Sequence, residues 1–520
     1  MTPDDRTTPG ELLAAAVADN NHERVARVIS AHVWSLFNTD YPAVIDAIGR
    51  IPAQVIERHP VLRLLHPMTP VVARASRPFD ASQFNMYLQS SSVNPAIVTV
   101  MQMIAARVSG DIATAQGYAK RLGDLIQRNR IPAIPGPQNP IWFFHHQIGS
   151  TLLMAGDTTA ALAEFSIARQ IGEVAGAADA IRCAAGRESL VHAVRGSVDD
   201  ALRSLTLAQQ AGRGTPAYDA AAASTERTAA AMISLQRMDD DVEVRVGRLD
   251  SPDAVDVIWP YILLARVQFA MANQRPAEAL ESVAITTATH PIQPGSFAAD
   301  LAVSASVRAQ LLLGDLDAAR RALDAALSPG PLTELAALRL ALHEGDFLRA
   351  HQMSGMLRGA AELSPVHRAE LALLAAWHEY QELGSLTPDA AFRAAEVIEP
   401  NRRQLLATFP EGLIRAILEQ LPAGIGDRLD ECVAGLRFRA PMHPRPLLTG
   451  AEQRVLDALP GNPSLADLAT ALQLSPNTVK TQLRKLYRKL GVTSRDEAVN
   501  AATRYSLWSA QPDPDAGRHG

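Results

Sequence analysis

Cysteine and long apolar runs are both scarce in this chain of 520 residues. Its two cysteines, Cys183 and Cys432, are far apart in the sequence, which excludes a disulfide framework and the usual zinc-binding patterns. No stretch approaches the ~18 uninterrupted apolar residues of a membrane-spanning helix. The acidic N-terminus also lacks the apolar centre of a signal peptide. We therefore expect a cytoplasmic protein that makes no membrane contact.

Lysine is the second scarce residue, with four lysines against 45 arginines. Three of the four, Lys480, Lys485 and Lys489, fall in the single stretch SPNTVKTQLRKLYRKLG. The fourth, Lys120, lies in the sequence GYAKRL and not in a G-x-x-x-x-G-K-[ST] motif. The chain therefore lacks a P-loop nucleotide site, and we expect no nucleotide hydrolysis.

Other catalytic motifs are also missing. There is no G-x-S-x-G, and the His-Glu pairs at His343 and His378 lack the second histidine of H-E-x-x-H. Packing is a better explanation than metal binding for His145 and His146, and Asp239–Asp241 is typical of a solvated turn. We expect no catalytic residues, no metal, no cofactor and no enzymatic activity.

The composition favours a soluble, mostly helical protein. Leu and Ala are abundant, and long stretches lack the alternation of apolar and polar residues that is typical of strands. The net charge is -6, so a surface that binds nucleic acid would have to be local.

A short phrase recurs with a mean period of about 40 residues. It begins with glycine, continues with Asp or Ser, and has alanine five places after the glycine. The glycine suits a left-handed helix end, the polar residue can cap the next helix, and the alanine permits close helix packing. The copies begin at Gly110, Gly156, Gly196, Gly314 and Gly345, with a degenerate copy at Gln274.

This pattern resembles the tetratricopeptide (TPR) helix-turn-helix repeat. The best copy, QIGSTLLMAGDTTAALAEFSIAR, places Ile148, Gly149, Gly156, Ala161, Phe165 and Ala168 at the packing positions of that repeat. The longer period is more similar to the repeats of the MalT-like sensor region, which implies an α-solenoid over residues 1–436. Such a solenoid offers a concave surface to a peptide, protein or small ligand. Trp142, Phe143 and Phe144 are candidate groove residues, although core packing is the favoured alternative.

A second domain follows a proline-rich linker at residues 437–446. Residues 447–509 carry three capping-box patterns, which pair Thr449 with Glu452, Ser464 with Asp467 and Ser494 with Glu497. Ser475 before Pro476 is a further helix start. These signals predict four short helices, and residues 510–520 are expected to form a disordered tail.

The third of these helices has two faces when it is projected at ~100° per residue. Its apolar stripe contains Val479, Leu483, Leu486 and Leu490. No acidic residue lies between Thr478 and Arg495, so ion pairs within the helix do not explain its charge. This favours a nucleic-acid surface over a merely solvated face. The opposite face carries Asn477, Lys480, Thr481, Arg484, Lys485 and Arg488, with Lys489 at its edge.

The whole segment resembles a LuxR-type helix-turn-helix domain. Its marks include Leu448-Thr449, Glu452, Val455-Leu456, Thr478-Val479-Lys480 and Lys489-Leu490-Gly491. The resemblance implies double-stranded DNA as the partner, with Lys480, Thr481 and Arg484 at base-reading positions. Asn477 and Thr481 lie at the N-terminal end of the helix, where base edges are usually met, and Thr478 is a further expected DNA-binding residue. The phosphate contacts would come from Lys485, Arg488, Lys489 and Arg495.

The resemblance also implies a homodimer on DNA, formed by the fourth helix. The apolar positions of that helix are Ala498, Ala501, Ala502 and Tyr505. The alternative is that this face simply closes the bundle.

We therefore expect an all-α, sequence-specific DNA-binding transcriptional regulator whose helical repeats sense a ligand or a protein partner. The alternative is a TPR-like interaction scaffold whose basic C-terminal domain binds DNA only within a larger complex.

Overall fold

The computed structural model describes residues 8–39, 41–56, 58–59, 62, 95–128, 140–212, 216–249, 257–290, 292–359, 363–398, 401–436, 448–490, 492–504 and 507. Every regular element in these ranges is a helix, which confirms the all-α prediction. None of the helices described is both long and apolar enough to cross a membrane. The predicted linker at 437–446 and the predicted tail at 510–520 lie outside these ranges, so the domain boundaries stay predictions.

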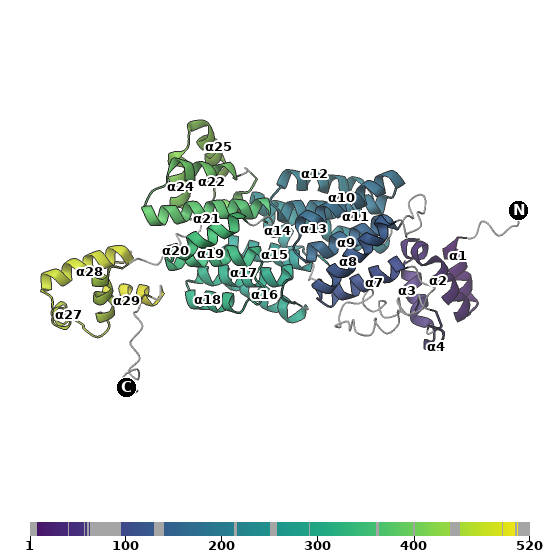
Figure 1. The fold of residues 1–520 in the computed structure, drawn as a ribbon, viewed down its shortest axis with the longest axis horizontal. Helices are drawn as coiled ribbons and strands as arrows, with labels where there is room; N and C mark the ends of the chain where they lie inside the picture. The colour runs from purple at the N-terminus through teal and green to yellow at the C-terminus, as the bar shows by residue number, and fades with distance from the viewer. Residues whose placement is uncertain are drawn as a thin grey trace.

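The first four helices form a small cluster around a core of their own (Figure 1). Leu13, Ile29 and Ile48 are fully or almost fully buried in this core. Thr8 and Glu11 form a capping box at the start of the first helix. The four helices are α1 (Pro9–Ala18), α2 (His22–Thr39), α3 (Tyr41–Arg50) and α4 (Ala53–Ile56).

The central part of the chain is a stack of helix pairs, coloured from blue to green in Figure 1. The first pairs are α7 (Pro95–Val108) with α8 (Ile112–Gln127), α9 (Ile141–Met154) with α10 (Thr158–Ala175), α11 (Ala178–Val194) with α12 (Val198–Gln210), and α13 (Pro216–Arg237) with α14 (Val242–Gly247). They continue with α15 (Trp259–Ala272) and α16 (Pro276–Thr289), α17 (Phe297–Leu313) and α18 (Leu316–Asp324), α19 (Pro331–Glu344) and α20 (Phe347–Gly359), and α21 (Pro365–Leu383) and α22 (Pro388–Glu396). The short helices α23 (Arg403–Leu406), α24 (Glu411–Gln420) and α25 (Ala423–Val433) follow.

The recurring phrase marks the turns within these pairs, as predicted. All five of its glycines have a positive φ, between 71° and 87°, and Gln274 in the degenerate copy has a φ of 58°. The carboxylate of Asp157 accepts a hydrogen bond from Ala160 N at 2.9 Å and so caps α10. The phrase alanines are fully buried, which confirms their predicted packing role; they are Ala115, Ala161, Ala201, Ala279, Ala319 and Ala350.

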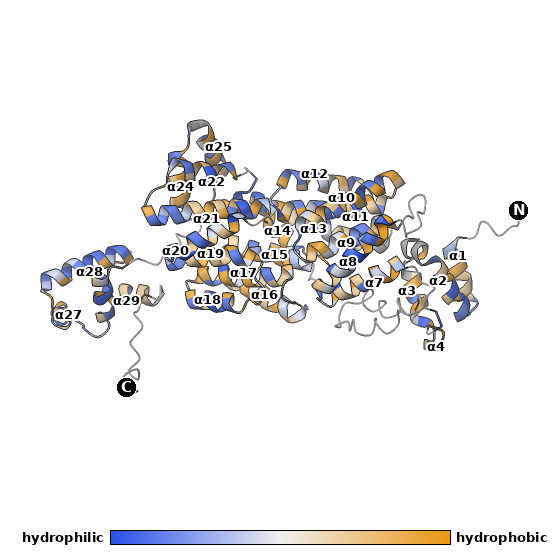
Figure 2. Ribbon diagram, in the orientation of Figure 1, coloured by the Kyte–Doolittle hydropathy of each residue, from blue (hydrophilic) through white to orange (hydrophobic). Residues whose placement is uncertain are grey.

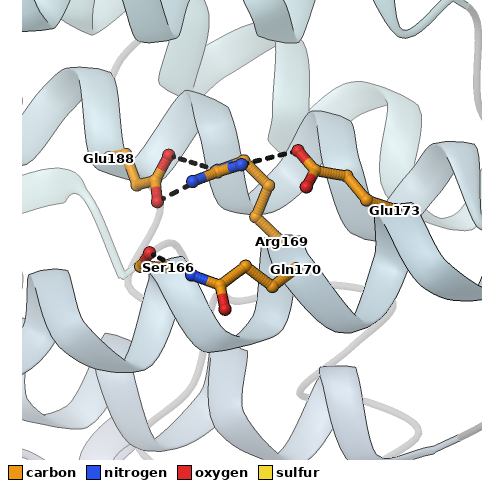
Figure 3. A network of polar contacts seen from close by, with 5 residues as sticks. All are labelled: Ser166, Arg169, Gln170, Glu173 and Glu188. Carbon is orange, nitrogen blue, oxygen red and sulfur yellow. Dashed lines mark hydrogen bonds and ion pairs between the residues drawn. The ribbon is translucent and has the colours of Figure 1, made fainter.

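Neighbouring pairs are joined by apolar contacts and by a few buried polar ones. Figure 2 shows that many of the central helices combine hydrophobic and hydrophilic segments, as amphipathic packing requires. Between α10 and α11, Arg169 Nε donates to both carboxylate oxygens of Glu188, at 2.9 and 3.2 Å (Figure 3). Arg169 also reaches Glu173 on its own helix, so one guanidinium holds two carboxylates. Such a pair fixes the register of one repeat on the next.

The stack curves until distant repeats touch. The backbone N–H of Val366, in α21, donates to the carbonyl oxygen of Arg195 at 3.0 Å, in the turn between α11 and α12. Arg402 Nε donates to the carbonyl oxygen of the neighbouring Gly196 at 2.8 Å. These bonds join residues about half the repeat region apart in sequence, and we call them the closure contact.

Candidate nucleic-acid interface

Four helices form the domain described over residues 448–490, 492–504 and 507, and three of them begin with the predicted capping boxes. Thr449 and Glu452 form the first box and Ser464 and Asp467 the second, each with both reciprocal hydrogen bonds. Ser494 N donates to Glu497, and Glu497 N donates back to the Ser494 hydroxyl. The helices are α26 (Gly450–Ala458), α27 (Leu465–Leu472), α28 (Pro476–Leu490) and α29 (Arg495–Arg504).

The turn between α27 and α28 is short and well capped. Gln473 ends α27 in the left-handed conformation, with φ 53° and ψ 42°. The next backbone N–H, of Leu474, returns to the carbonyl oxygen of Ala469 at 3.0 Å. Ser475 then accepts from Thr478 N at 3.2 Å, so it is the N-cap predicted for α28. The result is the helix-turn-helix geometry that the sequence predicts.

The apolar stripe of α28 faces the domain core. Val479 and Leu486 are completely buried, Leu490 is nearly so, and Leu483 packs at the edge of the same cluster. They meet Val455 and Leu456 of α26, together with Leu468 of α27. This burial fixes the rotation of α28 about its axis, and therefore which residues it presents outward.

The opposite face of α28 is exposed and basic, and Figure 2 draws this helix mostly hydrophilic. Its cations Lys480, Arg484, Lys485 and Arg488 form no ion pair with any carboxylate among the described residues. The sequence-predicted residues exposed on α28 are Asn477, Thr478, Lys480, Thr481, Arg484, Lys485, Arg488 and Lys489.

Lys489 differs from these four cations because it has a buried partner. Its Nζ lies 2.7 Å from Glu452 Oε2, and the Glu452 side chain is 3% exposed. Burial opposes ionisation of Glu452, but hydrogen bonds from Lys489 and Thr449 outweigh it and hold the pKa below its usual value. Lys489 thereby ties the end of α28 to the start of α26.

Arg495 is also engaged within the domain. Its guanidinium donates to the carbonyl oxygens of Pro463, at 3.1 Å, and of Leu459 and Asn462. These carbonyls follow the end of α26, where backbone acceptors lack partners within the helix. The structure thus places Arg495 as a cap on the loop before α27.

The apolar face of α29 is covered within the single chain. Ala498 and Ala502 are fully buried and Ala501 is 4% exposed, all in the core of the domain. This burial supports the interpretation in which the face closes the bundle. Tyr505 lies outside the described residues, and dimerisation stays a prediction.

The other residues that the sequence singles out take part in packing. Trp142 and Phe144 are buried, and Phe143 packs beside them, as the favoured alternative predicts. His145 Nδ1 lies 2.7 Å from Glu164 Oε2. Within the described ranges no three His, Cys, Asp or Glu side chains gather as a metal site would require.

Comparisons with known proteins agree with this geometry. Residues 446–502 match the family model described as "Bacterial regulatory proteins, luxR family". Two relatives, each named "Probable transcriptional regulatory protein NarL", come from Mycobacterium tuberculosis strains CDC 1551 / Oshkosh and ATCC 25618 / H37Rv. Each is 40% identical over 62 residues, which are 12% of this chain and 29% of the relative. The match therefore concerns this domain alone. Residues 446–502 are a LuxR-family helix-turn-helix domain, joined here to a region of helical repeats.

Proposed function

We propose that this protein is a sequence-specific DNA-binding transcriptional regulator, and that α28 is the helix that enters the major groove. The observation that carries the proposal is the exposed face of α28, with four cations unpaired by any described carboxylate. An unpaired cation that faces solvent costs the fold little free energy, and it contributes favourable binding free energy when it contacts a phosphate or a base edge.

The residues nearest the start of α28 read bases in this proposal. Lys480 and Arg484 lie four residues apart, on one helix face, and both can donate to guanine O6 and N7. Thr481 lies beside them and offers its methyl group to a thymine, because its hydroxyl already donates to the carbonyl oxygen of Asn477 at 2.9 Å. Asn477 and Thr478, in the first turn, are close enough to the same groove edge to assist.

Lys485 and Arg488 contact phosphates in this proposal. They lie further along α28, where the helix leaves the groove and passes the backbone. Such contacts add affinity that depends on salt and carry no base information. Lys489 and Arg495 act differently, because their internal partners hold α28 against α26 and hold the loop before α27.

We also propose that the helical repeats sense an effector and alter DNA binding, and that the protein acts as a homodimer on paired half-sites. The alanines of α29 are buried within the single chain, and a dimer contact at α29 that includes Tyr505 stays part of this proposal. The function requires no catalytic step.

The test begins with the selection of bound sequences from random DNA by the full-length protein. Binding to the selected site is then measured against salt for Arg484→Ala, Lys485→Ala and, as a matched control, Arg415→Ala. Arg415 is an exposed arginine of the repeat region, with a side chain 67% exposed.

Arg484→Ala should lose roughly 1–3 kcal/mol of binding free energy and relax base preference, whereas Lys485→Ala should weaken all DNA alike and flatten the salt slope by about 1. Arg415→Ala should behave as the wild type. Normal binding by the Arg484 variant would refute the groove assignment. Selection of no sequence by the protein alone, with recovery in cell extract, would favour the scaffold alternative.

A further inference from the structure

The repeat region contains a partly open cavity of about 520 Å³, lined by helices that are distant in the sequence. Its lining includes Gln236 of α13, Gln268 of α15, and Ser304 and Arg308 of α17. Glu370 of α21 and Gln404 of α23 line it as well. The volume falls within the range of small-molecule sites, about 300–1,000 Å³. Polar and charged side chains line the cavity together with apolar ones.

The carboxylates around this cavity are compensated by the protein itself. Asp300 accepts from the backbone N–H groups of Gly330, Leu332 and Thr333, at 2.8 to 3.1 Å, and so caps α19. Asp157 caps α10. These two charges are therefore stabilised by helix N-termini, where negative charge is favoured.

Glu370 is compensated from behind the cavity wall. Its Oε1 accepts from Arg339 Nη2 at 2.8 Å, and Arg339 is fully buried. Burial opposes ionisation of Glu370, but Arg308 and Arg339 outweigh it and lower the pKa to about 2. Glu370 is thus an ionised carboxylate, and its Oε1 already accepts a hydrogen bond from Arg339.

Arg308 does not have a comparable partner. Its Nη1 lies 3.8 Å from Glu370 Oε1, too far for a hydrogen bond, and it makes no hydrogen bond to any residue in the described ranges. The side chain is only 23% exposed. A guanidinium carries five N–H donors, and those of Arg308, whose side chain keeps part of its exposure, are available to a ligand that supplies acceptors.

Two acceptors that line the same cavity as Arg308 are also unused. The side-chain oxygen of Gln236 and that of Gln268 are buried and accept no hydrogen bond from a described group. Gln236 as a whole is 2% exposed. Gln268 and Arg308 each lie six residues before a left-handed turn residue, Gln274 and Gly314, so they occupy equivalent positions in successive repeats.

We propose that this cavity binds a small monoanionic carboxylate that also carries hydroxyl or ammonium donors, namely a hydroxy acid or an amino acid. Arg308 would hold the ligand carboxylate, and the oxygens of Gln236 and Gln268 would accept from its donors. A phosphate dianion fits less well, because the carboxylates of Glu370 and Asp300 also line the cavity and would repel the second charge.

This inference names the effector class for the sensing role proposed above, and for its regulatory meaning it rests on that proposal. The ligand would bridge α15 and α17 to α21 and α23. The closure contact joins the start of α21 and the residue before α23 to the turn between α11 and α12. Binding would therefore favour the closed form of the superhelix over more open ones.

The test is thermal unfolding of the full-length protein with the common amino acids, lactate and gluconate, each at millimolar concentration. At least one acid should raise the unfolding temperature, increasingly with concentration. Its amide or ester analogue, which lacks the negative charge, should not. Arg308→Gln should weaken the active acid by about 10- to 100-fold, and Gln268→Leu, a second variant, should also weaken it.

Arg275→Gln is the matched control, because Arg275 is an exposed arginine at the start of α16. It should keep the wild-type response. The inference is overturned if no member of the panel shifts the wild type, or if the shift survives in both cavity variants. Ligand binding is measured without DNA. If the protein selects a DNA sequence but no acid shifts its unfolding temperature, only the ligand-binding inference is contradicted. A rise in unfolding temperature without selection of any DNA sequence would instead support ligand binding in the cavity and contradict the proposed regulatory function.

Discussion

Arginine has two different environments in the C-terminal domain. Arg484 and Arg488 extend from α28 into solvent, whereas Arg495 donates to backbone carbonyls after α26. The planar guanidinium can serve several carbonyls from fixed directions, which an ammonium cannot do. Residue type therefore does not separate a DNA-contacting arginine from a structural one; the partners do.

Replacing Arg495 tests its structural role. Arg495→Ala should destabilise the domain by about 1–3 kcal/mol, because the carbonyls of Leu459, Asn462 and Pro463 lose their donor. Arg495→Lys should be nearly as damaging, since one ammonium cannot replace the fork. Hydrogen exchange over residues 450–464 of the full-length protein measures both effects.

DNA titrations with the same variants separate the two roles of Arg495. A structural arginine gives weaker binding with an unchanged salt slope. Normal exchange in Arg495→Lys, together with a salt slope flattened by about 1 in Arg495→Ala, would instead show a phosphate contact.

The sequence predicts the exposed residues of α28 well, because an amphipathic helix needs only its own periodicity to separate inside from outside. It does not predict the partners of Lys489 and Arg495. Glu452 is 37 residues from Lys489, and Leu459 is 36 residues from Arg495. Those contacts depend on how α26 packs on the other helices, which no local pattern encodes.

At the scale of the helix pair, the turns that carry the recurring phrase were predictable, whereas Gly384 ends α21 at a positive φ outside that phrase. Glycine adopts positive φ at little cost, so it marks the position in the sequence. Met238 has a φ of 57° at the end of α13 and carries no such mark. A side chain in this conformation is held there by the surrounding packing, so the residue type at that turn does not reveal it in the sequence.

Close packing between paired helices yields a prediction at the same scale. A Cβ on Gly149 would lie 2.8 Å from the Phe165 ring, and Phe165 is fully buried and cannot move aside. Gly149→Ala should therefore destabilise the repeat region by about 1–3 kcal/mol through overpacking. Thermal and denaturant unfolding of the full-length protein measure the change.

Gly117→Ala is the control for that prediction. Gly117 lies within α8, and a Cβ there would meet nothing within 4 Å. This substitution should stabilise by roughly 0.5–1 kcal/mol, because alanine favours helix over glycine. Equal effects at the two sites would mean that helix propensity, and not the Phe165 contact, determines the response at Gly149.

For the whole molecule, repeat spacing predicts the stack of helix pairs but not the contact between its distant parts. Arg402 and Gly196 are 206 residues apart and meet only because small rotations between successive pairs add up. The cavity is a product of the same curvature. Arg308 and Gln268 do not stand out in the sequence because they line a common cavity only in the closed superhelix.

The closure contact can be tested through Arg402. The side chain is almost fully buried, and its Nε donates to the Gly196 carbonyl while its Nη1 donates to that of Val397. Arg402→Ala removes charge-assisted bonds worth about 1.5–3 kcal/mol, so opening of the closure contact should become about 10- to 100-fold more frequent. Hydrogen exchange should accelerate in the peptide that contains Val366, whose N–H is bonded to the Arg195 carbonyl.

Arg415→Ala is the control. It affects only an exposed i,i+4 pair with Glu411 and should leave that exchange unchanged. If Arg402→Ala lowers stability uniformly without selective exchange at Val366, the two parts of the superhelix do not open as a unit, and ligand binding in the cavity could not act through the closure contact.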